Sequence, residues 1–140
     1  AVIWSRAGWS ASQRHPVGWV ANPQSDWEGL AASIRGGLSL GMSGNPYHGS
    51  AIGGFYGADK VDPELYVRWL QASVFASHMR LYGIGEREPW AFGTEAEGIA
   101  RKWLAFRYRL IPYLEHVIRV ASETGLPVMR AMPLASGMRT

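Results

Sequence analysis

The stretch that decides the fold is Pro16-Val-Gly-Trp-Val20, followed by the turn Asn22-Pro-Gln-Ser25 and a longer segment that runs to about Gly41. The first part is short and apolar, which is typical of a buried strand. Ser25 or Asp26 can cap the longer segment, which then repeats apolar residues at the spacing of a helix: Leu30, Ile34, Leu38 and Met42. A strand, a turn and a helix in this order form the unit from which parallel sheets are built.

Working outward, other short runs have the character of strands. Ala1–Trp4 is uninterruptedly apolar, and further strands are expected near Tyr47 and Ile52 and at Arg80–Tyr82. Val128–Thr140 begins like a strand and then loses the pattern. Since helices separate most of these runs, the sequence predicts an α/β fold with a parallel sheet.

Two more helices complete the alternation. One begins at Asp62-Pro-Glu64, with proline in the first turn and acids at the positive end of the helix dipole, and fades near His78. The other is long. Thr94 is expected to cap it, Pro112 to kink it and Gly125 to end it.

Composition excludes several classes of protein. The 140 residues carry 14 Lys and Arg against 11 Asp and Glu, and no Cys, so disulfide scaffolds and thiolate chemistry are excluded. The basic residues are scattered, which argues against a nucleic-acid partner. No apolar run reaches the roughly 18–20 residues of a membrane helix, and the first residues do not read as a signal peptide. We therefore expect a soluble chain without a membrane partner, with a cytoplasmic location favoured.

Aromatic residues are abundant, with seven Trp and six Tyr beside four Phe. Trp and Tyr can stack on sugar rings and also offer a polar edge, although most such residues belong to protein cores. The four histidines lack the spacing of a metal site, so we expect no metal and no cofactor: His15, His48, His78 and His116.

Seven motifs follow one another along nearly the whole chain: Arg6-Ala-Gly-Trp-Ser-Ala-Ser-Gln13, Pro16-Val-Gly-Trp19, Arg35-Gly-Gly-Leu-Ser-Leu-Gly-Met-Ser-Gly44, Ile52-Gly-Gly-Phe55, Leu65-Tyr-Val-Arg-Trp-Leu70, Arg87-Glu-Pro-Trp90 and Arg109-Leu-Ile-Pro-Tyr-Leu114. Together they resemble the C-terminal half of the catalytic barrel of glycoside hydrolase family 31, the α-glucosidases and α-xylosidases. The resemblance implies a partial (β/α)₈ TIM barrel, a half-barrel of roughly strands five to eight with their helices. Residues 1–132 would form this half-barrel, and residues 133–140 a tail leading out of it.

The resemblance also implies a retaining mechanism, which uses two carboxyl groups about 5 Å apart. The family's nucleophile is an Asp on strand four, and this sequence holds no candidate for it; its first residues suggest an excised or partial chain. In the family pattern the acid/base Asp stands three positions after the Trp of strand six. Trp19 and Trp27 match that pattern without a gap, so Asn22 occupies the acid/base position. Asp26 is the nearest carboxylate, and its expected role is helix capping, with a substitute acid as the alternative.

The positions that would contact sugar divide into retained and altered ones. Arg6 and Trp19 match family residues of strands five and six. Ala51 stands where the resemblance places a sugar-binding Asp, and Tyr82 where it places a sugar-binding His. These changes are grouped at ligand-facing positions while the surrounding motifs stay readable. They indicate a redesigned site or a homologue whose function has relaxed.

Two hypotheses follow from the resemblance. The chain is a segment of an α-glycoside hydrolase, acting on α-linked glucosides or xylosides, or it is a catalytically silent sugar-binding or scaffold half-barrel. Because the sequence lacks a candidate nucleophile and has Asn22 at the acid/base position, it favours a catalytically silent chain when the chain is taken by itself. A half-barrel would leave sheet edges uncovered, so the expected protein partner is a second copy or the missing N-terminal half.

Overall fold

The computed structural model describes residues 4–5, 14–15, 17–19, 22–57 and 60–136. Its sheet consists of three short parallel strands in the order β1 (Trp4–Ser5), β2 (Val17–Trp19) and β3 (Tyr47–Gly49). A parallel bridge between Ala51 and Arg80 extends the pairing beyond β3. The predicted α/β fold with a parallel sheet is therefore confirmed, with strands shorter than the sequence suggests.

The strand expected at the start of Val128–Thr140 is wrong for the described residues of that segment. The Val128 amide donates one hydrogen bond to the Pro46 carbonyl at 3.0 Å, and Met132–Ser136 then forms a short helix, α5. Pro127 and Pro133 have no N–H to donate, which makes this stretch unsuited to a strand ladder.

Helix α1 (Trp27–Met42) begins where the sequence predicts, because the Asp26 carboxylate accepts a hydrogen bond from the Gly29 amide at 2.6 Å. Its apolar stripe is not the face that it buries, since Ile34 is 36% and Met42 55% exposed. The buried face consists instead of small residues one turn apart: Gly29, Ser33, Gly37 and Gly41. Among them Gly37 lies directly against His48 of β3.

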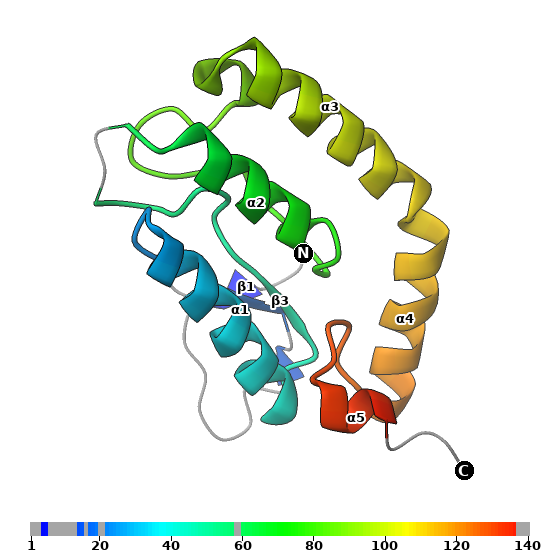
Figure 1. Cartoon of the computed structure of the whole chain (residues 1–140). Coiled ribbons are helices and arrows are strands. Elements are labelled where there is room, and N and C mark those ends of the chain that lie inside the picture. Colours follow the sequence, from blue (N-terminus) through cyan, green and yellow to red (C-terminus); the bar gives the residue numbers. More distant parts are fainter. Residues whose placement is uncertain (1–3, 6–13, 16, 20–21, 58–59, 137–140) are drawn as a thin grey trace.

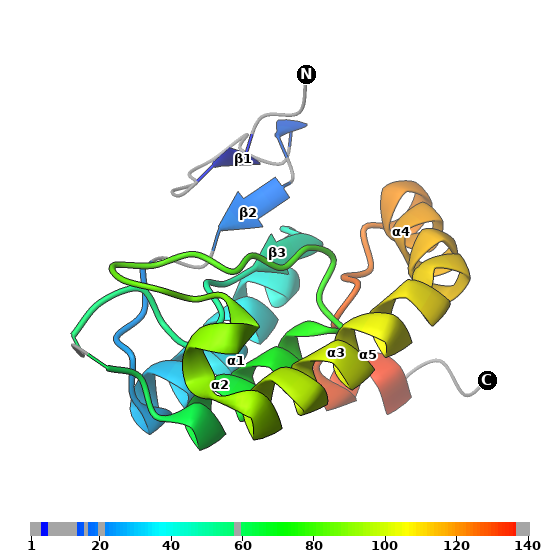
Figure 2. The same ribbon diagram turned by 90° about the horizontal axis from the view of Figure 1, so that it is seen from above.

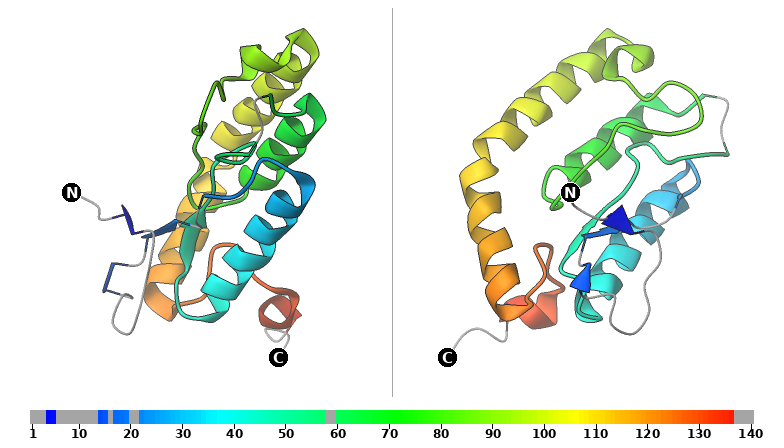
Figure 3. Two further views of the ribbon diagram at one scale, coloured as in Figure 1. Left: turned by 90° about the vertical axis from the view of Figure 1, so that its left-hand side faces the viewer. Right: turned by 180° about the vertical axis from the view of Figure 1, so that it is seen from behind.

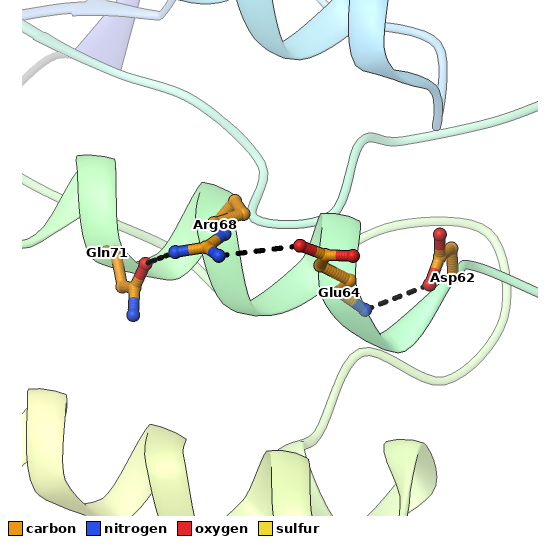
Figure 4. A network of polar contacts seen from close by, with 4 residues as sticks. All are labelled: Asp62, Glu64, Arg68 and Gln71. Atoms are coloured by element: carbon orange, nitrogen blue, oxygen red, sulfur yellow. Dashed lines mark hydrogen bonds and ion pairs between the residues drawn. The ribbon is translucent and has the colours of Figure 1, made fainter.

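Helix α2 (Pro63–Ser73) also begins as predicted, and a chain of polar contacts follows it on the solvent side (Figure 4). The Asp62 carboxylate accepts from the Glu64 amide at 2.9 Å. Arg68 pairs with Glu64 at 3.4 Å and donates to Gln71 at 3.3 Å. The opposite side of the helix supplies the main core: Leu65, Tyr66, Trp69 and Leu70 are at most 2% exposed.

The long C-terminal helix is two helices rather than one kinked helix. Helix α3 (Thr94–Arg109) and helix α4 (Ile111–Thr124) meet at Leu110 and change direction there (Figure 1). Pro112 lies in the first turn of α4, where its missing N–H is tolerated, whereas the middle of a continuous helix would lose a hydrogen bond and clash with the preceding turn.

At the ends of this pair of helices, the predicted N-terminal cap is wrong and the predicted C-terminal end is confirmed. Thr94 is the first helical residue rather than the cap; Gly93 takes the cap position, and no side chain there accepts a hydrogen bond. The 3₁₀ turn η2 (Pro89–Phe92) leads into this cap. Gly125 ends α4 as predicted, in the left-handed conformation with a φ of 76°.

The helices α1, α2 and α3 lie on one side of the strands (Figure 2), and α3 and α4 form an arc around the edge of the molecule (Figure 3). Between α2, α3 and η2 the Tyr66 and Phe92 rings stack at 3.9 Å with an interplanar angle of 13°. A second apolar cluster joins α4 to Val128. The carboxyl ends of the strands carry the loops that form the candidate site.

Candidate functional site at the carboxyl ends of the strands

Three loops that follow neighbouring strands are joined by backbone hydrogen bonds. The Phe55 amide donates to the Pro23 carbonyl, and the Ser25 amide donates to the Tyr56 carbonyl, both at 2.7 Å. The Ile84 amide donates to the Phe55 carbonyl, also at 2.7 Å. The loops after β2, after β3 and after Arg80 therefore form one surface, which brings together residues far apart in the sequence.

Asn22 lies at the end of β2 beside Trp19. The indole Nε1 of Trp19 donates to the Asn22 side-chain oxygen at 3.4 Å. This contact leaves the Asn22 amide nitrogen to donate to another oxygen. An amide has no proton that dissociates in the working range of a glycosidase, so Asn22 can orient an oxygen but cannot act as a general acid.

Arg80 separates the two aromatic residues of the site. Its guanidinium carbon lies 4.3 Å from the centre of the Trp19 ring and 4.1 Å from the centre of the Tyr82 ring. Trp19 is 7% exposed, whereas Tyr82 is 48% exposed and its other neighbour, Phe55, lies 5.4 Å away with the rings tilted by 42°. Tyr82 is therefore the accessible end of a stack of two rings and one cation.

The remaining predicted site residues have different surroundings. Ala51 is fully buried and pairs with Arg80, so its methyl group does not reach the surface. Asp26 caps α1 through the bond to the Gly29 amide, as the capping interpretation expects. Arg6 lies outside the described residues, and its predicted sugar contact stays a prediction.

Arg87 begins the motif Arg87-Glu-Pro-Trp90, from which the sequence predicted no role for it. In the structure it joins the loops of the site. It is 4% exposed. Its guanidinium donates to the Gly54 carbonyl at 3.0 Å and to the Ser25 hydroxyl at 3.2 Å, while its own carbonyl accepts from the Tyr66 hydroxyl at 2.9 Å. Burial lowers the pKa of Arg87 and raises the pKa of Tyr66. The sequence signal was the run of glycines around it: a Cβ on Gly83 would lie 2.8 Å from Arg87 Nε.

His78 is hydrogen-bonded to β2 and packs against the end of β3. Its Nε2 lies 3.0 Å from the Gly18 carbonyl oxygen, which can only accept, so this nitrogen carries the proton. Gly49 lies under it, and a Cβ there would be 2.3 Å from the His78 carbonyl oxygen. Burial lowers the pKa of His78 to about 4. The imidazole is therefore neutral at physiological pH, and it holds the segment after α2 against β2.

The described side chains of the site can donate and accept hydrogen bonds and stack on a ring. Asn22 contributes an amide to this surface and Tyr82 a phenol, whereas the methyl group of Ala51 is buried beneath it. Within the described residues, no group of three or more His, Asp or Glu side chains could hold a metal ion. None of the helices in that part of the chain has the length and hydropathy required to cross a membrane.

Comparison with known proteins identifies the barrel. The family model described as the glycosyl hydrolases family 31 TIM-barrel domain matches residues 1–117. A probable glucan 1,3-alpha-glucosidase of Oryza sativa subsp. japonica is 38% identical over 133 residues, which cover 93% of this chain and 14% of that protein.

Solved structures of the same family superpose on this chain. A family 31 dextranase of Flavobacterium johnsoniae complexed with glucose superposes with a TM-score of 0.83 at 41% identity, over 94% of this chain and 18% of that one. A family 31 alpha-xylosidase from a soil metagenome complexed with xylose gives 0.84 at 31% identity, over 91% of this chain and 22% of that one. The chain spans less than a quarter of the length of these relatives. It belongs to glycosyl hydrolase family 31 and adopts the α/β TIM-barrel type of fold of that family.

Proposed function

We propose that this chain binds α-linked glucosides or xylosides on the loops at the carboxyl ends of its strands and does not cleave them by itself. The observation that carries the proposal is the hydrogen bond from Trp19 Nε1 to the Asn22 side-chain oxygen. It holds an amide, beside the strand-end Trp, at the position where the family resemblance expects the acid/base carboxyl group. The related dextranase and alpha-xylosidase structures that contain glucose and xylose supply the ligand class.

We further propose that residues 1–132 correspond to the C-terminal half of the family barrel, with residues 133–140 leading out of it. The parallel order of β1, β2 and β3, continued by the bridge from Ala51 to Arg80, supports this assignment. Four consecutive parallel strand segments, each placed beside the next, are what one half of an eight-stranded barrel supplies. The nucleophile of the family would then be carried by a strand that this sequence does not contain.

In the proposed complex Asn22 donates its amide N–H to a glycosidic or hydroxyl oxygen, while its own oxygen is occupied by Trp19. Tyr82 provides the accessible ring for the apolar face of the sugar, because Arg80 covers the ring of Trp19 on the side that it faces. Arg6 is expected to add hydrogen bonds to sugar hydroxyls, as the resemblance implies. Binding therefore takes place without the proton transfer that departure of an alkoxide requires.

The test compares binding with turnover on the same full-length chain. Saturation-transfer NMR with isomaltose and with methyl α-xyloside should detect binding, and neither glycoside should be hydrolysed. An aryl α-glucoside with a nitrophenolate leaving group tests for a nucleophile separately from a general acid. Nitrophenolate departs without receiving a proton, so its release does not need the acid. No release of nitrophenol is expected even from this substrate. Robust turnover would overturn the proposal.

Asp26→Asn is the matched variant, because asparagine caps a helix about as well as aspartate. It removes the nearest carboxylate while keeping α1 intact, so binding and the absence of turnover should both be unchanged. Turnover in the parent chain that this variant abolishes would identify Asp26 as the acid. Absence of any sugar binding would favour the alternative, a scaffold half-barrel without a working site.

A further inference from the structure

A small cavity lies between α1, β3 and α2. Its volume is about 30 Å³. Apolar groups from Leu30, Trp69 and Met129 form part of the wall, but Ser33, His48 and Ser73 bring polar side chains to it. A cavity needs roughly 10–15 Å³ of this volume, and two to four polar partners, to hold one water molecule. This one has the size for one or two.

Two of the residues that line this cavity each carry a buried polar atom without a hydrogen-bond partner in the described part of the chain. Ser33 Oγ and His48 Nδ1 are buried and make no hydrogen bond within the described part of the chain. The residues are 7% and 5% exposed. Leaving a buried donor or acceptor unpaired is costly, and native structures pair the great majority of such groups with protein or with ordered water.

The His48 ring is packed tightly between β3 and α1. His48 belongs to β3, and its carbonyl accepts from the Ser77 hydroxyl at 3.0 Å. Its imidazole lies directly against α1, since a Cβ on Gly37 would be 2.3 Å from His48 Nε2. Ser33 is one turn earlier on the same buried face of α1. Both residues line the cavity, and the contact with Gly37 limits the movement of the His48 ring.

A third polar group at the cavity is partly satisfied. The Ser50 hydroxyl accepts from Trp69 Nε1 at 3.1 Å and keeps its own proton to donate. Ser50 follows β3, and Trp69 belongs to α2. The cavity is thus bordered by hydrogen-bonding groups from each of the three elements that enclose it.

We propose that this cavity is a hydration site, in which one or two water molecules bridge Ser33 Oγ on α1 and His48 Nδ1 on β3. The bound water supplies the hydrogen bonds that α1, packed through small residues, cannot make directly to the sheet. It contributes to the attachment of α1 to the strand layer that carries the loops after β2 and β3. This site is independent of the proposed function and stands or falls separately from it.

Ser33→Ala on the full chain gives opposite results for a hydrated and a dry cavity. If water bridges the two groups, the variant loses a hydrogen bond, and the melting temperature falls by roughly 2–5 °C relative to the control. If the cavity is dry, the variant removes an unsatisfied hydroxyl, and the melting temperature rises or is unchanged. The control is Ser39→Ala, an exposed serine on the same helix, which corrects for the better helix propensity of alanine.

A second measurement observes the water itself. Magnetisation transfer from long-lived bound water to the His48 ring protons and to nearby β3 amides should appear in the parent chain and weaken in Ser33→Ala. His48→Phe keeps a ring of similar size and removes both nitrogens; combined with Ser33→Ala it should cost less than the sum of the two single changes, because the first change already disrupts the bridge. Absence of the bound-water signal, or additive effects of the two changes, would overturn the proposal.

Discussion

Arg87 shows how a single buried side chain can position a whole surface. Replacing it with Met keeps much of its volume but leaves the Gly54 carbonyl and the Ser25 hydroxyl without their donor. We predict a loss of about 3 kcal/mol in the free energy of unfolding, since removing one member of a buried hydrogen-bonded group leaves the others desolvated and unpaired. Urea denaturation measures this.

The matched control for that prediction is Arg35→Met. Arg35 forms an ion pair with Glu28 at 2.5 Å, but the two side chains are 65% and 80% exposed. An exposed pair of this kind contributes at most about 1 kcal/mol. Equal losses in the two variants would contradict a positioning role for Arg87.

Two buried histidines make the stability of the fold depend on pH. Burial lowers the pKa of His78 to about 4 and also lowers the pKa of His48. An unfolded histidine titrates near 6.5, so between these values the unfolded chain binds more protons than the folded one. Their stabilising contribution is complete above about pH 6.5 and is lost as the pH falls through this window toward 4.

We therefore predict that the melting temperature of the parent chain falls between pH 6.5 and 4, and that His78→Gln flattens this fall. His116→Gln, which changes an exposed residue on α4, should keep the slope of the parent chain. Melting curves at half-unit pH steps measure both. A parent curve that is level over this range would refute the role of the buried imidazoles.

At the scale of single residues, sequence reasoning succeeded where spacing carries the information and failed where it does not. Trp19 and Asn22 were both identified by their spacing in the family pattern, and the structure joins their side chains by a hydrogen bond. The stack of Trp19, Arg80 and Tyr82 joins segments some sixty residues apart. No local pattern records which cation will lie between which rings.

At the scale of the elements, the close approach of α1 to β3 makes one glycine essential. The pair Gly36-Gly37 in the sequence suggested close packing, and a Cβ on Gly37 would indeed lie 2.3 Å from His48 Nε2. Gly37→Ala should destabilise the chain by roughly 2 kcal/mol through overpacking, although alanine favours helices.

Gly98→Ala is the opposite case on α3. Nothing lies within 4 Å of the position where its Cβ would stand. The change should stabilise the chain by about 0.5–1 kcal/mol through helix propensity alone. Chemical denaturation of both variants tests the contrast, and a stabilised Gly37→Ala would show that α1 can move away from the sheet at little cost.

Helix positions were predictable from capping and periodicity, but their boundaries and buried faces were less so. Asp26 and Gly125 were identified because their chemistry fixes a helix end locally. The cap at Thr94 was wrong, because Gly93 with its φ of 91° takes the cap position. In α1 the stripe of larger residues was visible in the sequence, yet the small residues beside it form the buried face, since tertiary packing requires short side chains there.

At the scale of the whole molecule, the parallel order of the described strands has two ends. β1 pairs with β2 on one side, and at the other end the bridge to Ala51 is made by Arg80. Beside that second edge lies a groove of about 480 Å³ between residues 77–81 and the helices α3 and α4. Its walls are largely apolar: Met79, Leu81, Leu104, Ile111, Leu114 and Ile118. A sheet edge next to an apolar groove is suited to receive another strand.

We predict that this chain associates in solution, with a second copy or with an N-terminal half of a family 31 barrel supplying the strand. Burial of even several hundred Å² of apolar surface in the groove contributes roughly 10 kcal/mol at about 25 cal/mol per Å². Analytical ultracentrifugation over a dilution series should show a reversible dimer or larger species of the isolated chain. Ile111→Lys, a partly exposed residue of the groove, should shift this equilibrium toward monomer while the melting transition is kept.

The control is Tyr113→Lys, a more exposed residue of α4 that does not line the groove, and it should associate like the parent chain. Loss of association in both variants would mean that the added positive charge prevents association whether or not it lies in the groove. A parent chain that stays monomeric at micromolar concentration with a cooperative melt would show instead that the edge beside Arg80 is stable without a partner. The groove would then have to be covered by the chain's own residues, and the family's barrel closure would not be needed for these strands to fold.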